Sequence, residues 1–135
     1  MINNKIIKMA LDTKFFGLEN NCSHKATLKN KKCGDIIKIE LKIKKNKIYT
    51  MRYETESCIF CQATASLLAR KINIFNPQKL KNDMDYFYKN IQGVEKNLPA
   101  KYKIFKDLFN NRNINRIDCI MLPFNALIKA LEFKI

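Results

Sequence analysis

Between Ile37 and Thr55 the chain alternates apolar and polar residues twice, with a short interruption. In the first run, four aliphatic residues face one way and four charged residues the other: Ile37, Ile39, Leu41 and Ile43 against Lys38, Glu40, Lys42 and Lys44. A period of two over this length is typical of a half-buried strand. Lys45 and Asn46 can turn the chain, and residues 48–55 alternate again. The pattern therefore predicts an antiparallel hairpin with one apolar face and a solvated, lysine-rich face.

The apolar face of this hairpin needs a cover, and most other segments have helical periodicity. Ser57 is a good N-cap for the helix after the hairpin, and that helix must end before Pro77, because the residue ahead of proline avoids the helical region. Pro123 is tolerated only in the first turn of the last helix. Residues 20–32 have no period, which predicts a loop. The predicted helices are residues 2–19, 58–73, 78–92, 102–109 and 119–131.

Together these elements predict an α+β fold, in which a small antiparallel sheet packs against several helices. A third strand beside the hairpin is left open. The length of 135 residues suits one domain over residues 1–135. No apolar run reaches the roughly 18 residues of a transmembrane helix. The N-terminus also lacks the apolar core of a signal peptide, so we expect a cytoplasmic protein with no membrane association.

The chain is strongly basic, with 26 Lys and Arg against 12 Asp and Glu and a net charge of +14. Such a charge suits nucleic acid or an acidic partner protein. However, only four of the basic residues are arginine, and proteins that read nucleic acids favour arginine for its bidentate fork. The abundance of Lys, Asn and Ile is what an AT-rich genome produces. Nucleic acid is therefore not the expected partner.

Five cysteines, an odd number, make metal or sulfur chemistry a better first hypothesis than a disulfide framework. Cys58 and Cys61 form a Cys-x-x-Cys motif at a predicted helix start, where the helix dipole favours the thiolate. This motif alone is compatible with a redox pair, half of a zinc ribbon, or two buried apolar residues. Cys33 directly precedes the hairpin and Cys58 follows it, so the two should lie close together. With Asp35 and Cys119 they would make a four-coordinate site suited to zinc or iron.

Three motifs in order resemble the U-type iron–sulfur cluster assembly proteins, namely IscU, SufU and the N-terminal domain of NifU. The first is Cys33-Gly34-Asp35 before the alternating strand, and the second is Glu56-Ser57-Cys58 followed by the small residues 63–66. The third is Arg116-Ile117-Asp118-Cys119 before the last helix. The resemblance covers roughly residues 20–133. Cys119 follows Cys58 by 61 residues, a spacing like that of SufU.

The resemblance implies a chemistry and a set of residues that perform it. A cysteine desulfurase passes persulfide sulfur to the U-type protein, which builds an iron–sulfur unit and hands it to apo acceptor proteins. The implied ligands of zinc, iron or a transient [2Fe–2S] cluster are Cys33, Asp35, Cys58 and Cys119. Cys119 would accept the sulfur, and Arg116 could stabilise thiolate or persulfide charge nearby.

Several residues depart from the family pattern. Asp118 stands where the family has His or Lys, so its carboxylate opposes a persulfide at Cys119 unless it binds iron or turns to solvent. Cys61 is an additional cysteine that we expect to be a buried core residue. Cys22 and His24, the only histidine, lie in the predicted loop and are not expected to be ligands.

The main hypothesis is thus a scaffold and sulfur acceptor rather than an enzyme. Its nearest alternative is a zinc-dependent sulfurtransferase that shuttles sulfur without assembling a cluster. A more distant one is a basic, metal-free adaptor that binds an acidic partner or nucleic acid.

Overall fold

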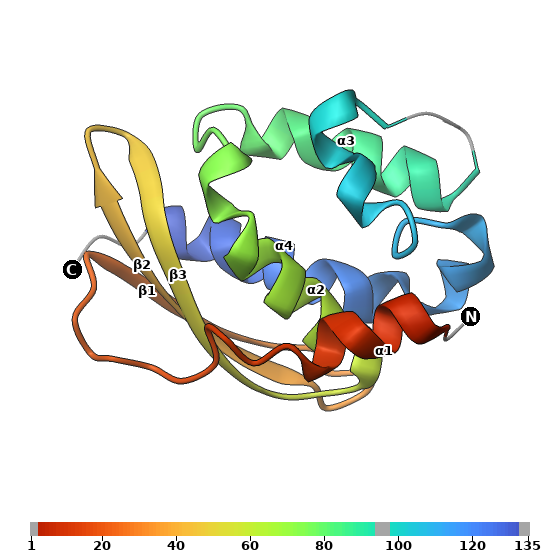
Figure 1. Ribbon diagram of the computed structural model, residues 1–135, viewed down its shortest axis with the longest axis horizontal. Helices are drawn as coiled ribbons and strands as arrows, with labels where there is room; N and C mark the ends of the chain where they lie inside the picture. Colours follow the sequence, from red (N-terminus) through yellow and green to blue (C-terminus); the bar gives the residue numbers. More distant parts are fainter. Residues whose placement is uncertain (1–2, 94–97, 133–135) are drawn as a thin grey trace.

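The computed structural model describes residues 3–93 and 98–132, and it has the predicted α+β architecture. A three-stranded antiparallel sheet is covered on one face by α2 and α4, α1 packs against α2, and α3 lies farther from the sheet (Figure 1). In chain order the elements are α1 (Asn4–Leu11), β1 (His24–Lys29), β2 (Ile36–Lys44), β3 (Lys47–Glu56), α2 (Ile59–Arg70), the 3₁₀ helix η1 (Ile72–Ile74), α3 (Leu80–Ile91), the 3₁₀ helices η2 (Ala100–Phe105) and η3 (Asn111–Arg116), and α4 (Ile117–Glu132). No helix in these ranges is long and apolar enough to span a bilayer.

The predicted hairpin is confirmed as β2 and β3. Ile37 pairs with Thr55 and Lys44 pairs with Lys47, so two residues, Lys45 and Asn46, form the turn. Both have positive φ, 53° and 63°, the conformation of the tight turns that match the twist of a hairpin. The aliphatic residues Ile37, Ile39 and Leu41 are buried, as the alternation predicts.

The predicted loop over residues 20–32 is wrong in its centre, where residues 24–29 form β1. This strand pairs antiparallel with β2 from His24 opposite Leu41 to Lys29 opposite Ile36. It is an edge strand, and only Ala26 and Leu28 turn apolar side chains toward the core. Two apolar residues among polar neighbours are too weak a local signal, so pairing with β2 decides the structure of this segment.

The segment before β1 is anchored to the sheet by one buried carboxylate. Glu40 on β2 is only 5% exposed, and its carboxylate accepts the backbone N–H groups of Glu19 at 2.8 Å and Asn20 at 3.1 Å. Arg52 on β3 donates to the carbonyl of Gly17 at 2.9 Å. The predicted helix over residues 2–19 is therefore shorter in the structure: α1 ends at Leu11, and the hydrogen bonds above hold the segment that follows. Ile2, where the predicted helix began, lies outside the described residues.

Helix α2 lies at the centre of the fold and contacts α1, β3 and α4. Its small buried residues, Ala63, Ala65 and Ala69, let these neighbours approach closely. The predicted N-cap was wrong. Cys58, not Ser57, is the N-cap of α2, because the Ser57 hydroxyl accepts a hydrogen bond from Thr55 at 2.7 Å instead. The helix ends at Arg70 and continues as η1.

The C-terminal half of the chain buries a group of six aromatic rings between α3, η2 and α4. These are Phe75, Phe87, Tyr102, Phe105, Phe109 and Phe124. The predicted helix over residues 78–92 is confirmed as α3. The predicted helix over residues 102–109 is wrong, because η2 and turns occupy this segment. Helix α4 begins at Ile117, two residues before the predicted start. Pro123 therefore lies in the helix interior rather than in its first turn.

Candidate metal and sulfur site

A tight turn between β1 and β2 presents Cys33 and Asp35. Gly34, between them, has φ +77°, a conformation that residues with a Cβ rarely adopt. Its N–H donates to the carbonyl of Asn30 at 2.8 Å, and the N–H of Asn30 donates to the carbonyl of Asp35 at 2.8 Å. Cys33 is exposed on the outside of this turn, whereas Asp35 is only 6% exposed. The Cys-Gly-Asp motif thus combines an exposed cysteine with a buried carboxylate.

The second strand of the hairpin returns the chain to this carboxylate. The backbone N–H of Cys58 donates to Oδ1 of Asp35 at 3.2 Å. Cys58 has the extended backbone of an N-cap, and its own side chain makes no capping bond. Asp35 therefore supplies the negative charge that the N-terminus of a helix favours, and it couples the β1–β2 turn to the start of α2.

Helix α4 brings the third cysteine to the same place. Sγ of Cys119 lies 3.8 Å from Sγ of Cys33, although 86 residues separate them. One ligand atom each from Cys33, Asp35 and Cys119 lie within 4.8 Å of one another. Burial, followed by the neighbouring Cys58 thiol, raises the pKa of the Cys119 thiol well above its ordinary value. Cys58 is thus an immediate neighbour of the three-residue cluster but not part of it by this distance.

Pro123 removes one hydrogen bond from the turn of α4 that carries Cys119. A proline has no N–H, so the carbonyl of Cys119, four residues earlier, lacks its usual helical donor. Pro123 is itself a buried residue of α4.

A buried carboxylate oxygen of the site suits a bound cation. Oδ2 of Asp35 is buried and has no hydrogen-bond partner within residues 3–93 and 98–132. A buried carboxylate oxygen left without a partner costs roughly 1–3 kcal/mol, which a bound cation would offset. Thiolates with a carboxylate are a donor set that zinc and iron accept. The residues present therefore fit a metal ion or an iron–sulfur unit.

Asp118, the departure next to Cys119, turns to solvent. Its side chain is 57% exposed, and its carboxylate lies 3.5 Å from Nζ of Lys32. Lys32 directly precedes Cys33. The sequence analysis did not predict its ion pair with Asp118, and the position of Lys32 next to Cys33 was the only feature of the sequence that pointed to it. This ion pair joins the two cysteine-bearing segments at the surface of the site, and Lys32 offsets the negative charge of Asp118.

The other residues singled out by the sequence are not members of the cluster. Arg116 is exposed at the end of η3, and in the described part of the chain it makes no hydrogen bond or ion pair with Cys119. Cys61 is fully buried, as predicted, and burial raises the pKa of its thiol to about 12. Cys22 lies beside Glu40, where burial raises the pKa of its thiol. His24 begins β1, with Nδ1 2.9 Å from the hydroxyl of Ser23.

A three-stranded sheet covered by helices, with cysteines and an aspartate meeting at one end, defines a small α+β protein with a candidate metal site. The sequence model described as NifU-like N terminal domain matches residues 1–108. The chain belongs to this family. The match ends before Cys119, so the position of the third cysteine at the site rests on the geometry of the structure.

Solved structures share the whole fold. A NifU-like protein (N-terminal) from Brucella abortus is 22% identical with a TM-score of 0.79, and the similarity covers 96% of this chain and 91% of that one. A protein of Fervidobacterium islandicum AW-1, proposed as the iron–sulfur cluster assembly scaffold of the SUF system, is 22% identical with a TM-score of 0.77 and covers 96% of both chains. A search of curated proteins found no match.

Proposed function

We propose that this chain is an iron–sulfur cluster assembly scaffold, in which iron and sulfide are the cargo. The observation that carries the proposal is the meeting of Cys33, Asp35 and Cys119 within 4.8 Å, in a chain of the NifU-like N-terminal family. Cys58, whose N–H binds Asp35, completes a set of three thiols and one carboxylate. These four residues would hold zinc, iron or a nascent [2Fe–2S] cluster.

The sulfur would come as persulfide from a cysteine desulfurase. Cys33 is exposed and Cys119 is only 5% exposed, so the donor meets Cys33 first. The Cys33 thiolate attacks the outer sulfur of the donor persulfide, and the donor cysteine leaves as a thiolate that takes up a proton. The Cys119 thiol, at 3.8 Å, then attacks the outer sulfur of the Cys33 persulfide, and its proton passes to the Cys33 thiolate that leaves. Neither step needs an oxidant, because each S–S bond that breaks is replaced by another.

The partners that follow from this chemistry are a cysteine desulfurase and apo iron–sulfur acceptor proteins. The reduced cytoplasm suits a chain with five free thiols. The family and the structural neighbours give no support to a sulfurtransferase that builds no cluster, or to a metal-free basic adaptor.

The ligand set is tested by anaerobic purification followed by metal and sulfide analysis. We expect Cys33→Ser, Cys58→Ser and Cys119→Ser each to lower the metal content. Cys22→Ser is the matched control, since Cys22 is partly exposed like Cys58 but lies beside Glu40. If the three variants keep as much metal as Cys22→Ser, the assignment is wrong.

The order of sulfur transfer is tested by incubating the chain with a desulfurase and cysteine, then locating the persulfide by mass spectrometry. Cys33→Ser should prevent labelling of Cys119, and Cys119→Ser should leave the persulfide on Cys33. Labelling of Cys119 in the Cys33→Ser variant at the normal rate would exclude the relay.

A further inference from the structure

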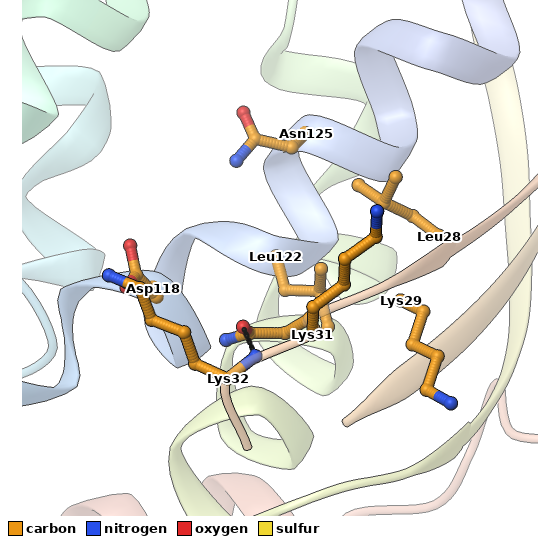
Figure 2. Close-up of a pocket in the computed structure, with 8 residues that line it drawn as sticks. Leu28, Lys29, Lys31, Lys32, Asp118, Leu122 and Asn125 are labelled. Atoms are coloured by element: carbon orange, nitrogen blue, oxygen red, sulfur yellow. Dashed lines mark hydrogen bonds and ion pairs between the residues drawn. The ribbon is translucent and has the colours of Figure 1, made fainter. Parts of the chain in front are cut away.

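A basic surface pocket lies directly beside the cysteine site. It has a volume of about 350 Å³ and is formed between the β1–β2 turn and helix α4 (Figure 2). Its lining consists of three lysines, one carboxylate, two amides and two leucines: Lys29, Lys31, Lys32, Asp118, Asn30, Asn125, Leu28 and Leu122. These eight residues define the lysine pocket.

Two residues that line the lysine pocket are direct sequence neighbours of cysteines of the site. Lys32 directly precedes Cys33, and Asp118 directly precedes Cys119. The ion pair between Lys32 and Asp118 therefore lies at the border between the pocket and the cysteine site. A chain segment held in the pocket would place its next residues at Cys33, the exposed thiol.

The charges of the lysine pocket favour an anion. Lys29 and Lys31 are exposed, and within the described ranges neither makes an ion pair. In Figure 2, Lys31 extends over the pocket toward Leu28, while Lys32 reaches toward Asp118. The pair between Lys32 and Asp118 has exposed side chains, 85% and 57%, and such pairs are held weakly. An incoming carboxylate can therefore replace Asp118 as the partner of Lys32 at a small cost in free energy.

The lining favours an acidic protein segment over nucleic acid. No arginine lines the pocket for bidentate contacts with phosphates or guanine, and no aromatic ring lines it for base stacking. Leu28 and Leu122 supply an apolar floor and Asn125 an amide, which suit the methylenes and backbone of a peptide. Complementary charge across an interface speeds encounter and sets orientation.

We propose that the lysine pocket binds an acidic segment of the sulfur donor, a stretch of Asp and Glu next to the donor's persulfide cysteine. This inference rests on the proposed function, because the segment docked here presents its sulfur to Cys33. Lys29 and Lys31 position the donor and take no part in the exchange of sulfur.

The probe for binding is a fluorescent, end-capped peptide, Glu-Asp-Glu-Asp-Gly-Cys, measured by anisotropy at low ionic strength. The test variant is Lys29→Glu/Lys31→Glu. The matched control is Lys44→Glu/Lys47→Glu, which makes the same change in net charge with exposed lysines at the opposite end of the hairpin. We expect the test variant to bind about tenfold more weakly than the control, corresponding to about 1.4 kcal/mol.

A second measurement uses the persulfide form of the same peptide and follows labelling of Cys33. The test variant should label more slowly than the control at low salt, and the difference should shrink at high salt because exposed charges are screened. The metal and sulfide content of the test variant should equal that of the unmodified chain. Cluster content is measured separately, so a chain that builds no cluster contradicts the proposed function, while the peptide data still decide the pocket.

Three results would overturn the proposal. One is equal weakening of peptide binding in the test and control variants, which would mean attraction to net charge alone. Another is a failure of the peptide to bind the unmodified chain. The third is displacement of the peptide from the lysine pocket by single-stranded RNA at lower concentrations than by unlabelled peptide.

Discussion

Replacing Asp35 by alanine separates the structural part of this carboxylate from its part as a ligand. The two oxygens have different surroundings. Oδ1 accepts the N–H of Cys58 at 3.2 Å, and Oδ2 is buried with no hydrogen-bond partner in the described ranges. Loss of a hydrogen bond to a charged group costs about 1.5–3 kcal/mol, while removal of the unpartnered oxygen recovers about 1–3 kcal/mol. In the metal-free protein these two effects nearly cancel, so the free energy of unfolding should change by less than about 2 kcal/mol.

With a metal present the same substitution removes a ligand. Metal bound to the folded chain alone stabilises it by mass action, so the gain in unfolding free energy on adding Zn²⁺ reports the affinity of the site. We expect this gain to be clearly smaller for Asp35→Ala than for the unmodified chain. Asp118→Ala is the matched control, because it removes an exposed carboxylate next to Cys119 and should keep the full gain.

The assay is urea unfolding followed by circular dichroism, with chelator and with Zn²⁺. Two results would refute the reasoning. If metal-free Asp35→Ala is less stable by more than about 4 kcal/mol, the carboxylate is mainly structural. If Zn²⁺ stabilises Asp35→Ala as much as Asp118→Ala, Asp35 is not a ligand.

Three further substitutions test the packing and electrostatics. Phe124→Ala should lower the free energy of unfolding by about 3–5 kcal/mol, because this fully buried ring lies in the aromatic group; a change below about 1 kcal/mol in urea unfolding would contradict that position. Glu40→Ala should cost about 2 kcal/mol or more and speed proteolysis before β1, since the N–H groups of Glu19 and Asn20 lose their acceptor. Cys61 has a pKa raised from 9.0 to about 12, so its contribution to stability is complete below pH 9 and lost as pH rises toward 12. Cys61→Ala should therefore show a smaller loss of stability than the unmodified chain over that range, and equal losses in thermal unfolding would refute the burial of this thiol.

Local patterns were enough to predict the hairpin and one end of the site. The alternation from Ile37 onward leaves a single register that buries the aliphatic face, because a slip of one residue would bury the lysines. Gly34 marks the sharp turn between the exposed Cys33 and the buried Asp35. The hairpin then returns Cys58 to the same end, as its N–H bond to Asp35 shows.

Other features depend on contacts between distant segments, which local patterns do not record. Strand β1 has few apolar residues and exists because β2 offers it backbone partners. Cys58, the N-cap of α2, donates its N–H to Asp35, 23 residues earlier, a contact that the local pattern around Ser57 does not record. Pro123 stands inside α4, where the burial of its neighbours outweighs one lost hydrogen bond.

Some features of the site likewise follow from local sequence patterns, and others depend on tertiary packing. The types of its residues and the hairpin that joins Cys33 to Cys58 follow from sequence, because a period of two and a glycine turn act over neighbouring residues. The approach of Cys119 to 3.8 Å from Cys33, and the pairing of Asp118 with Lys32, come from the packing of α4 against β1 and β2. That packing buries apolar side chains from both ends of the chain together, and only the folded structure brings them into contact.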